Sequence, residues 1–360
     1  MNRDTDNPET AGLEPALEGS AEASWSRLLW VTTRIDEDSR SARWIEAAAA
    51  RAERIDVFAT HRVKPALPAN VELTDRIASP TRIGAAVAGL RRQALRADAV
   101  VVQGPALLMQ AVQSVLTSSD RPILRLRIDR TPSDPRDPLT FTPGPVADAA
   151  LFVPAERHGA ETVRVISHGP MLSSTRWEET MEIFALAAQA QATLELELVG
   201  VGPVDSGLLR ELRRRRSALP TSLGARINIV TGMTQPEVAV RLRKADLYLD
   251  LSEGQELDRA LLEALSCQLQ VLSNNWAARK LADELPGILP LTGIETARQM
   301  GRNALVLESA SRHLMPEFAR IPSRRYVLQH HSFDAFTHRL TEAVEQAALA
   351  AESRASQAVN

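Results

Sequence analysis

Several residue types and patterns are scarce in this sequence, and each scarcity excludes something. Its 360 residues include one cysteine, Cys267, so no disulfide can form within the chain. With no apparent secretory segment, this fits a reducing compartment, and we expect a cytoplasmic protein. Aromatic residues make up only 4%, which predicts cores built from leucine, alanine and valine. A net charge of −3 argues against a strongly basic nucleic-acid interface, so we expect no nucleic-acid partner.

Long hydrophobic runs are also missing. No apolar stretch reaches the roughly 18–20 residues that span a bilayer. Residues 1–24 are acidic and lack the apolar centre of a signal peptide. We expect them to form a disordered tail.

Short apolar runs alternate with amphipathic segments through the first half. The pattern predicts strands at 27–33, 55–60, 71–77, 99–105 and 122–128, and helices at 41–54, 83–95 and 106–116. Continuous apolar strands between helices indicate a parallel sheet covered on both faces. Five prolines then interrupt the pattern within residues 129–145, which predicts a surface loop or an interdomain connection.

The alternation resumes after this proline-rich segment. Strands are predicted at 147–153, 163–168, 194–200, 225–232, 246–252 and 269–273, and helices at 174–190, 206–219, 235–244, 257–266 and 333–351. The predicted fold class is α/β, with two Rossmann-like domains facing a cleft. We place an N-terminal domain at 25–145, a C-terminal domain at 146–325 and a helical segment at 326–360.

A series of short motifs follows the strands of the second half. It comprises Leu-Val-Gly-Val-Gly-Pro at 198–203, Thr-Gly-Met at 231–233, a strand ending in Ser-Glu-Gly at 252–254, and Leu-Leu-Glu-Ala-Leu-Ser at 261–266. This order resembles the C-terminal domain of GT-B glycosyltransferases, specifically the retaining group that uses nucleotide-activated sugars. The resemblance covers about residues 160–275, and it implies the two-domain fold and a nucleotide-sugar cleft.

The resemblance also implies roles for individual residues in donor binding. Gly200 and Gly202 would border the cleft, because glycines after a strand let a backbone approach phosphate. Backbone near Gly232 and Met233 would meet the base. Glu263 would accept hydrogen bonds from the ribose. The other interpretations are an empty turn at the glycines and a solvated helix face for Glu263.

A first acidic residue is expected eight positions before Glu263, where this chain has Gln255. Its neighbour Glu256 would reach the donor sugar only after a one-residue adjustment, so both residues remain candidates for the sugar-contacting position. The resemblance also implies two cations that neutralise the diphosphate. Arg176 stands at the second cation position, after the Gly169 turn, whereas Pro170 or Met171 occupies the first. The alternative for Arg176 is a solvated helix cap, and we expect nearby His168 to be structural.

Other positions depart from the family pattern. A small-Gly-x-Pro turn and a Gly-Gly pair are replaced at 267–270 and 273–280. Asp36 and Asp38 match the Asp-x-Asp pattern of a metal-binding motif, but they lie in the loop predicted between the first strand and the first helix. We therefore expect no metal, and no cofactor apart from the nucleotide-sugar co-substrate. Arginines 213–216 point around their helix and predict solvated surface, with contact to an anionic membrane or an acidic partner left open.

The leading hypothesis is a glycosyltransferase that moves a sugar from a nucleotide-diphosphate donor to an acceptor, with retention. The acceptor class stays open among carbohydrate, glycolipid and protein. The motif departures motivate an alternative, a catalytically inactive partner subunit or binding module on the same fold. A nucleotide-sugar epimerase ranks last, because no convincing acid/base pair is evident.

Overall fold

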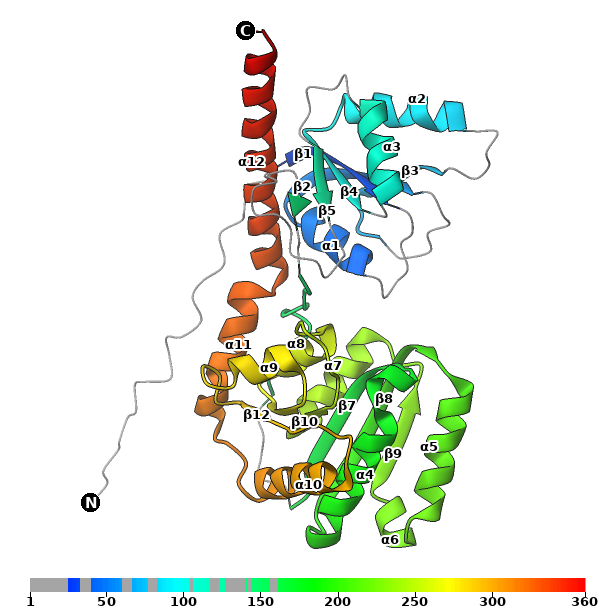
Figure 1. Cartoon of the computed structure of the whole chain (residues 1–360), viewed down its shortest axis with the longest axis vertical. Helices are drawn as coiled ribbons and strands as arrows, with labels where there is room; N and C mark the ends of the chain where they lie inside the picture. Colours follow the sequence, from blue (N-terminus) through cyan, green and yellow to red (C-terminus); the bar gives the residue numbers. More distant parts are fainter. Residues whose placement is uncertain are drawn as a thin grey trace, which may run out of the picture.

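The computed structural model describes residues 25–32, 40–59, 67–76, 83–103, 106–116, 123–126, 140–141, 144–155 and 161–359. Within these ranges, the strands form two parallel sheets, each six-stranded (Figure 1). We call the first sheet with its covering helices the first lobe, and the second sheet with its covering helices the second lobe. The predicted α/β fold with two Rossmann-like halves is confirmed.

The first lobe has the strand order β3-β2-β1-β4-β5-β6. Its strands are β1 Trp25–Thr32, β2 Ala52–Ala59, β3 Val71–Arg76, β4 Ala99–Gln103, β5 Ile123–Leu126 and β6 Thr140–Phe141, and its helices are α1 Arg40–Ala49, α2 Ile83–Ala94 and α3 Ala106–Leu116. Leu28 and Val101 face α1, whereas Leu29 and Val100 face α2 and α3. Both faces of the sheet are thus buried, which explains its continuous apolar strands.

The second lobe has the order β12-β11-β10-β7-β8-β9. Its strands are β7 Val163–Met171, β8 Leu194–Val204, β9 Ile227–Thr231, β10 Leu247–Asp250, β11 Gln270–Ser273 and β12 Ile288–Pro290. Its helices are η2 Ser173–Thr175, α4 Trp177–Ala190, α5 Ser206–Ala218, α6 Thr221–Gly224, α7 Gln235–Lys244, α8 Arg259–Ser266, α9 Trp276–Leu281 and α10 Ala297–Arg312. The chain's direction of winding reverses between β7 and β10. In open parallel sheets, ligands bind beyond the carboxyl ends of the strands at such a switch point.

The chain returns to the first lobe at its end. Helix α11, Glu317–His330, is followed by α12, Phe333–Val359, which runs along the first lobe (Figure 1). Phe336 stacks on Trp44 of α1 with ring centroids 6.4 Å apart, and both residues are buried. His331 at the α11–α12 junction accepts a backbone hydrogen bond from Ala147, with nitrogen and oxygen 2.8 Å apart. The last helix therefore ties the connection between the lobes to the first lobe.

Two sequence predictions about regular elements are wrong. Residues 147–153 form a turn and not a strand, because Asp148 accepts hydrogen bonds from the backbones of Ala150 and Leu151. The predicted helix 41–54 ends at Ala49, and residues from Ala52 onward pair with β1. The sequence predicted no elements between 276 and 325, where α9, β12, α10 and the start of α11 form, whereas the helical segment predicted from 326 contains the end of α11 and α12. Residues 36–38 lie outside the described ranges.

None of the helices in the described part of the chain combines the length and the apolar composition needed to cross a membrane.

Candidate functional site

A cavity of about 310 Å³ lies between the lobes, at the carboxyl ends of β7 and β10. This is the switch point of the second sheet. The first lobe and the connection contribute Arg43, Trp44, Pro145 and Val146 to its wall. The second lobe contributes Ser167, His168, Gly169, Pro170, Thr175, Trp177, Val201, Tyr248, Asp250, Leu251, Ser252, Asp258, Arg259, Ala260 and Glu263. Both lobes are therefore needed to enclose the site.

The end of β7 forms one wall through a turn at Gly169. This glycine has a φ of 150°, a backbone conformation that side chains disfavour. The following carbonyl, of Pro170, accepts hydrogen bonds from Nε1 of Trp177 at 3.2 Å and Oγ1 of Thr175 at 3.0 Å. These bonds fix the turn against the start of α4.

Glu263 of α8 is the centre of a buried polar network. Its Oε2 lies 2.7 Å from Nε2 of His168, and its Oε1 lies 3.2 Å from Nε of Arg259. Gln235 completes the network when its amide nitrogen is assigned to the side that faces Glu263: it then donates to Oε1 at 3.0 Å and accepts from Arg259 at 3.2 Å. Only 2% of the Glu263 side chain is exposed. A buried carboxylate is expected to be paired and hydrogen-bonded in this way.

A second acidic group, Asp250, is the last residue of β10. Its carboxylate accepts hydrogen bonds from Oγ of Ser273 at 2.6 Å and from the Ser252 backbone at 2.9 Å. Burial and the nearby Asp258 carboxylate raise the pKa of Asp250 to about 7. Asp258 caps α8 by accepting from the Leu261 backbone at 2.7 Å. Two carboxyl groups that repel each other when both are ionised therefore line the same cavity.

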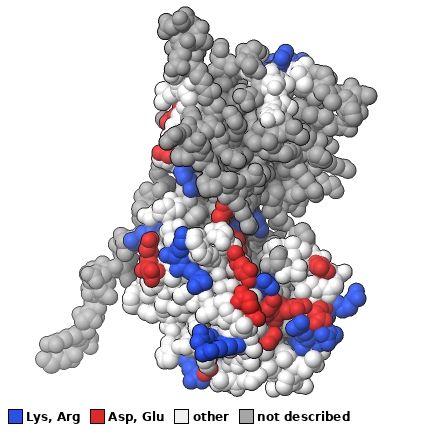
Figure 2. All heavy atoms as spheres, in the orientation of Figure 1, with Lys and Arg blue, Asp and Glu red and all other residues white. Residues whose placement is uncertain are grey.

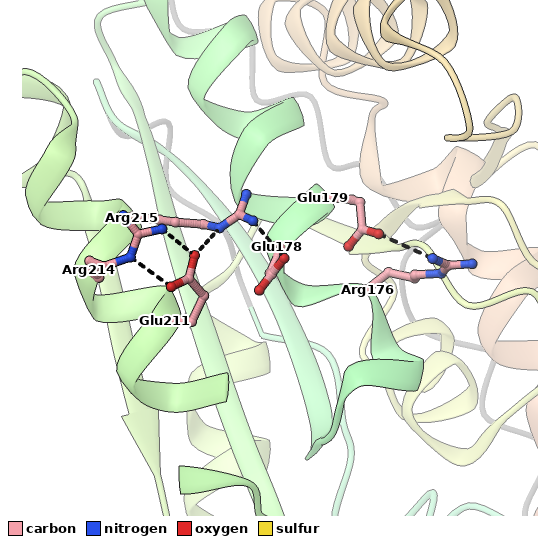
Figure 3. Close-up of polar contacts among 6 residues, drawn as sticks. All are labelled: Arg176, Glu178, Glu179, Glu211, Arg214 and Arg215. Atoms are coloured by element: carbon pink, nitrogen blue, oxygen red, sulfur yellow. Dashed lines mark hydrogen bonds and ion pairs between the residues drawn. The ribbon is translucent and has the colours of Figure 1, made fainter. Parts of the chain in front are cut away.

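Arg176 lies beside the cavity, between two residues that line it. It caps α4 with a φ of 54°, a left-handed conformation for a non-glycine residue. Its guanidinium lies 3.3 Å from Glu179 and 3.1 Å from Glu253, with the side chain 40% exposed. Figure 3 shows Arg176 reaching along the start of α4 toward Glu179. Two carboxylates therefore already compensate the positive charge of Arg176, the residue predicted to bind the diphosphate.

Comparison of the structures decides the fold. A glycosyltransferase from Rickettsia africae superposes with a TM-score of 0.66 at 9% identity, covering 89% of this chain and 98% of that chain. HepE from Anabaena, in complex with UDP, gives 0.67 at 12%, covering 89% and 99%. Sucrose-phosphate synthase from Thermosynechococcus elongatus gives 0.58 at 13%, covering 89% and 98%.

The chain has the GT-B fold. No protein-family model and no curated protein sequence matches it. At these identities the solved structures are similar to this chain in fold, and the resemblance inferred from its motifs is confirmed at that level.

The GT-B motif residues are not all brought together. Glu263 and Gly169 line the interlobe cavity, and Arg176 adjoins it. Gly200, Gly202, Gly232 and Met233 are outside the cavity wall, as are Gln255 and Glu256. Their predicted roles in substrate binding or catalysis stay predictions.

The glycine turn at 200–203 differs from its predicted form. Strand β8 continues through it to Val204. A Cβ atom at Gly200 would lie 3.1 Å from both Met171 and Thr231, so close packing alone requires a small residue there. Gly202 and Gly232 have φ values of 70° and 73°, which glycine adopts without strain. The loop before α8 is held by Asn275, which donates to the Glu256 carbonyl at 3.0 Å.

Sequence reasoning missed several residues of the site. It took His168 as structural and assigned no role to Tyr248, Asp250, Asp258 or Arg259, all of which line the cavity. A polar residue at the end of an apolar strand, as at Asp250, and a helix cap, as at Asp258, were the available signals. The pairing of His168 with Glu263 had no local signal, since 95 positions separate them.

The arginine run at 213–216 lies on the surface, as predicted, but two of its side chains are paired with carboxylates. Arg214 and Arg215 bind Glu211 on the same helix, and Arg215 reaches Glu178 on α4 at 2.9 Å (Figure 3). Figure 2 shows both signs of charge interspersed on this face of the second lobe. Because the two signs of charge are mixed, the electrostatic field of this face is weak and attracts an anionic surface only slightly.

Proposed function

We propose that this protein is a glycosyltransferase that binds a nucleotide-diphosphate sugar in the interlobe cavity and transfers the sugar to an acceptor with retention. The observation that carries the proposal is the cavity's position at the β7–β10 switch point, enclosed by both lobes. The GT-B relatives with this fold are glycosyltransferases, and HepE has been solved with UDP and with UDP-glucose.

The chemistry requires stabilisation of a departing diphosphate. As the bond between the anomeric carbon and the diphosphate breaks, negative charge builds on the diphosphate oxygens. Arg176 is the proposed cation, and it would exchange its contact with Glu253 for the diphosphate. The Gly169 turn leaves room for phosphate beside it. Gln255 or Glu256 is the proposed contact for the donor sugar, and closure of the lobes would exclude water.

A second candidate function is a catalytically inactive partner subunit or binding module. Two observations favour it. The guanidinium of Arg176 is already paired with Glu179 and Glu253, and the position expected to carry the first carboxylate holds the uncharged Gln255. Such a protein would bind a donor without turning it over, or would bind no donor at all.

Thermal unfolding in the presence of UDP-glucose, GDP-mannose and dTDP-glucose tests donor binding. A ligand that binds only the folded state raises its stability, by about 2.7 kcal/mol at a concentration 100 times its Kd. We expect one donor at millimolar concentration to raise the Tm. No shift with any of the three would contradict the proposal, including its donor-binding part.

Turnover separates the two candidates. We expect release of the nucleoside diphosphate, slow with water alone and faster once the acceptor is supplied. Glu253→Gln should strengthen binding of the diphosphate by removing one of the two carboxylates that pair with Arg176, and Arg176→Ala should abolish that gain. A donor that binds but is never cleaved, even with candidate carbohydrate, glycolipid and protein acceptors, would favour the inactive partner.

A further inference from the structure

The carboxylate of Glu263 faces inward, onto protein groups. Oε1 is engaged by Arg259 and Gln235, and Oε2 by His168. The side chain of Glu263 is 2% exposed, and both of its oxygens already have protein partners. A direct contact between Glu263 and a donor hydroxyl would first require these partners to leave.

His168 contacts Oε2 of this carboxylate and is itself part of the cavity wall. Only 2% of the His168 side chain is exposed. The second ring nitrogen, Nδ1, is buried and has no hydrogen-bond partner among the described residues. The ring is held from one side by the edge of Tyr248, with centroids 5.4 Å apart. Buried polar atoms without partners are rare in native proteins, and each calls for an explanation.

The network fixes which nitrogen carries the proton. The carboxylate of Glu263 faces the Arg259 guanidinium and accepts hydrogen bonds from its neighbours. Nε2 of His168 therefore donates to Glu263, and in the tautomer with hydrogen on Nε2 the other nitrogen, Nδ1, is a bare acceptor. An acceptor at a cavity wall suits a ligand group that donates a hydrogen bond, such as a sugar or ribose hydroxyl.

We propose that His168 is the binding residue that accepts a hydrogen bond from a hydroxyl of the donor through Nδ1, with Glu263 as its positioning residue. The inference rests on the proposed donor site and assigns the recognition of that hydroxyl to the imidazole. Contact with Nδ1 requires a small side-chain adjustment at the wall, because this atom is closed to solvent without a ligand.

Nitrogen-15 NMR of the histidine-labelled full chain, titrated with UDP-glucose, GDP-mannose and dTDP-glucose, tests the proposal. We expect His168 in the tautomer with hydrogen on Nε2, and a change of its Nδ1 resonance at saturation with the donor that binds. The resonance is assigned by its loss in His168→Gln or in His168→Asn. His313, which is exposed on the far side of the second lobe's core, is the internal control and should not shift.

Two variants separate the contact from the fold. Glutamine places its amide where Nε2 lies, so His168→Gln keeps a partner for Glu263 and removes Nδ1. Asparagine places its amide where Nδ1 lies, so His168→Asn keeps an acceptor at the cavity and abandons Glu263. By calorimetry we expect His168→Gln to bind the donor about tenfold more weakly, and His168→Asn to retain more of the affinity. His313→Gln should bind like the wild type.

The outcomes are distinct. A donor that binds the wild type while the Nδ1 resonance stays unchanged and His168→Gln binds equally well overturns the role of His168 and leaves the donor site standing. If both His168 variants lose binding equally and the Nδ1 resonance of the wild type does not change, the His168–Glu263 pair is purely structural. This result also overturns the inference. Absence of binding by all three donors overturns the proposed function and this inference together. If His168→Gln does not fold, the resonance in the wild type decides.

Discussion

Nε2 of His168, near the end of β7, lies 2.7 Å from Oε2 of Glu263 on α8, and both side chains are almost fully buried. This contact joins the two strand-to-helix junctions that flank the switch point of the second sheet. It places a polar network at the floor of the cavity between the lobes.

Glu263→Ala should lower the free energy of unfolding by about 3 kcal/mol. The change removes the shared acceptor of His168, Arg259 and Gln235, so Nε2 of His168 is left buried without a partner and Arg259 loses its carboxylate. Glu182→Ala, on the exposed face of α4, is the matched control and should change stability by less than about 0.5 kcal/mol. Urea unfolding of the variants measures both values, and equal losses would show that the network contributes nothing.

Asp250 should make stability fall as the pH rises from about 4 to about 7. Its pKa is raised from 3.8 to about 7 in the folded protein, so in this window the folded state holds a proton that the unfolded chain has released. Stability therefore decreases with pH, by at most about 1.4 kcal/mol per pH unit, and levels off above pH 7. Asp250→Asn keeps an acceptor for Ser252 and removes the titration.

The difference in unfolding free energy between wild type and Asp250→Asn isolates this effect, because titrations elsewhere cancel. It should decline from pH 4.5 to pH 7. A difference that is flat, or that grows with pH, would contradict the raised pKa.

His331 should act in the opposite direction over the same range. Burial lowers its pKa from 6.5 to about 4, while Nδ1 lies 3.0 Å from the Pro145 carbonyl. Between these values the unfolded chain binds a proton that the folded protein refuses, so stability is lost as the pH falls. His331→Asn keeps a donor near Pro145 without titrating. Relative to it, the wild type should lose up to about 3 kcal/mol between pH 7 and pH 4. Parallel pH profiles of the two proteins would refute this.

Arg176→Gly should be more stable than Arg176→Ala by about 1 kcal/mol. Both variants remove the half-exposed pairs with Glu179 and Glu253, which are worth little. Only glycine relieves the left-handed backbone at φ 54°. Thermal unfolding compares the two, and equal stability would mean that the backbone here carries no strain. A strained residue beside a cavity is a common feature of functional sites.

Much of the fold followed from the sequence, because fully buried parallel strands appear as continuous apolar runs between helices. The same signal failed at residues 147–153, where Ala147 and Phe152 are buried without forming a strand. Apolar burial and strand pairing coincide in the sheets but not in this turn. The short strand β12 had too few residues to show a period, and the flanking helices were not predicted.

The site was less predictable than the fold. Glu263 and Arg176 were found through the motif order, but their partners were not, since contacts such as His168 with Glu263 join distant strand ends. Trp44 and Arg43 of α1 form part of the cavity wall only because the lobes meet there. No local sequence pattern within α1 predicts that these two residues contact the cavity.

A crystal structure of the full chain grown with the donor that raises the Tm most tests the central claim most directly. The account predicts the nucleotide-sugar in the cavity between the lobes, beside Gly169, with a hydroxyl within hydrogen-bonding distance of Nδ1 of His168. A donor bound elsewhere on the protein while this cavity stays empty would contradict it.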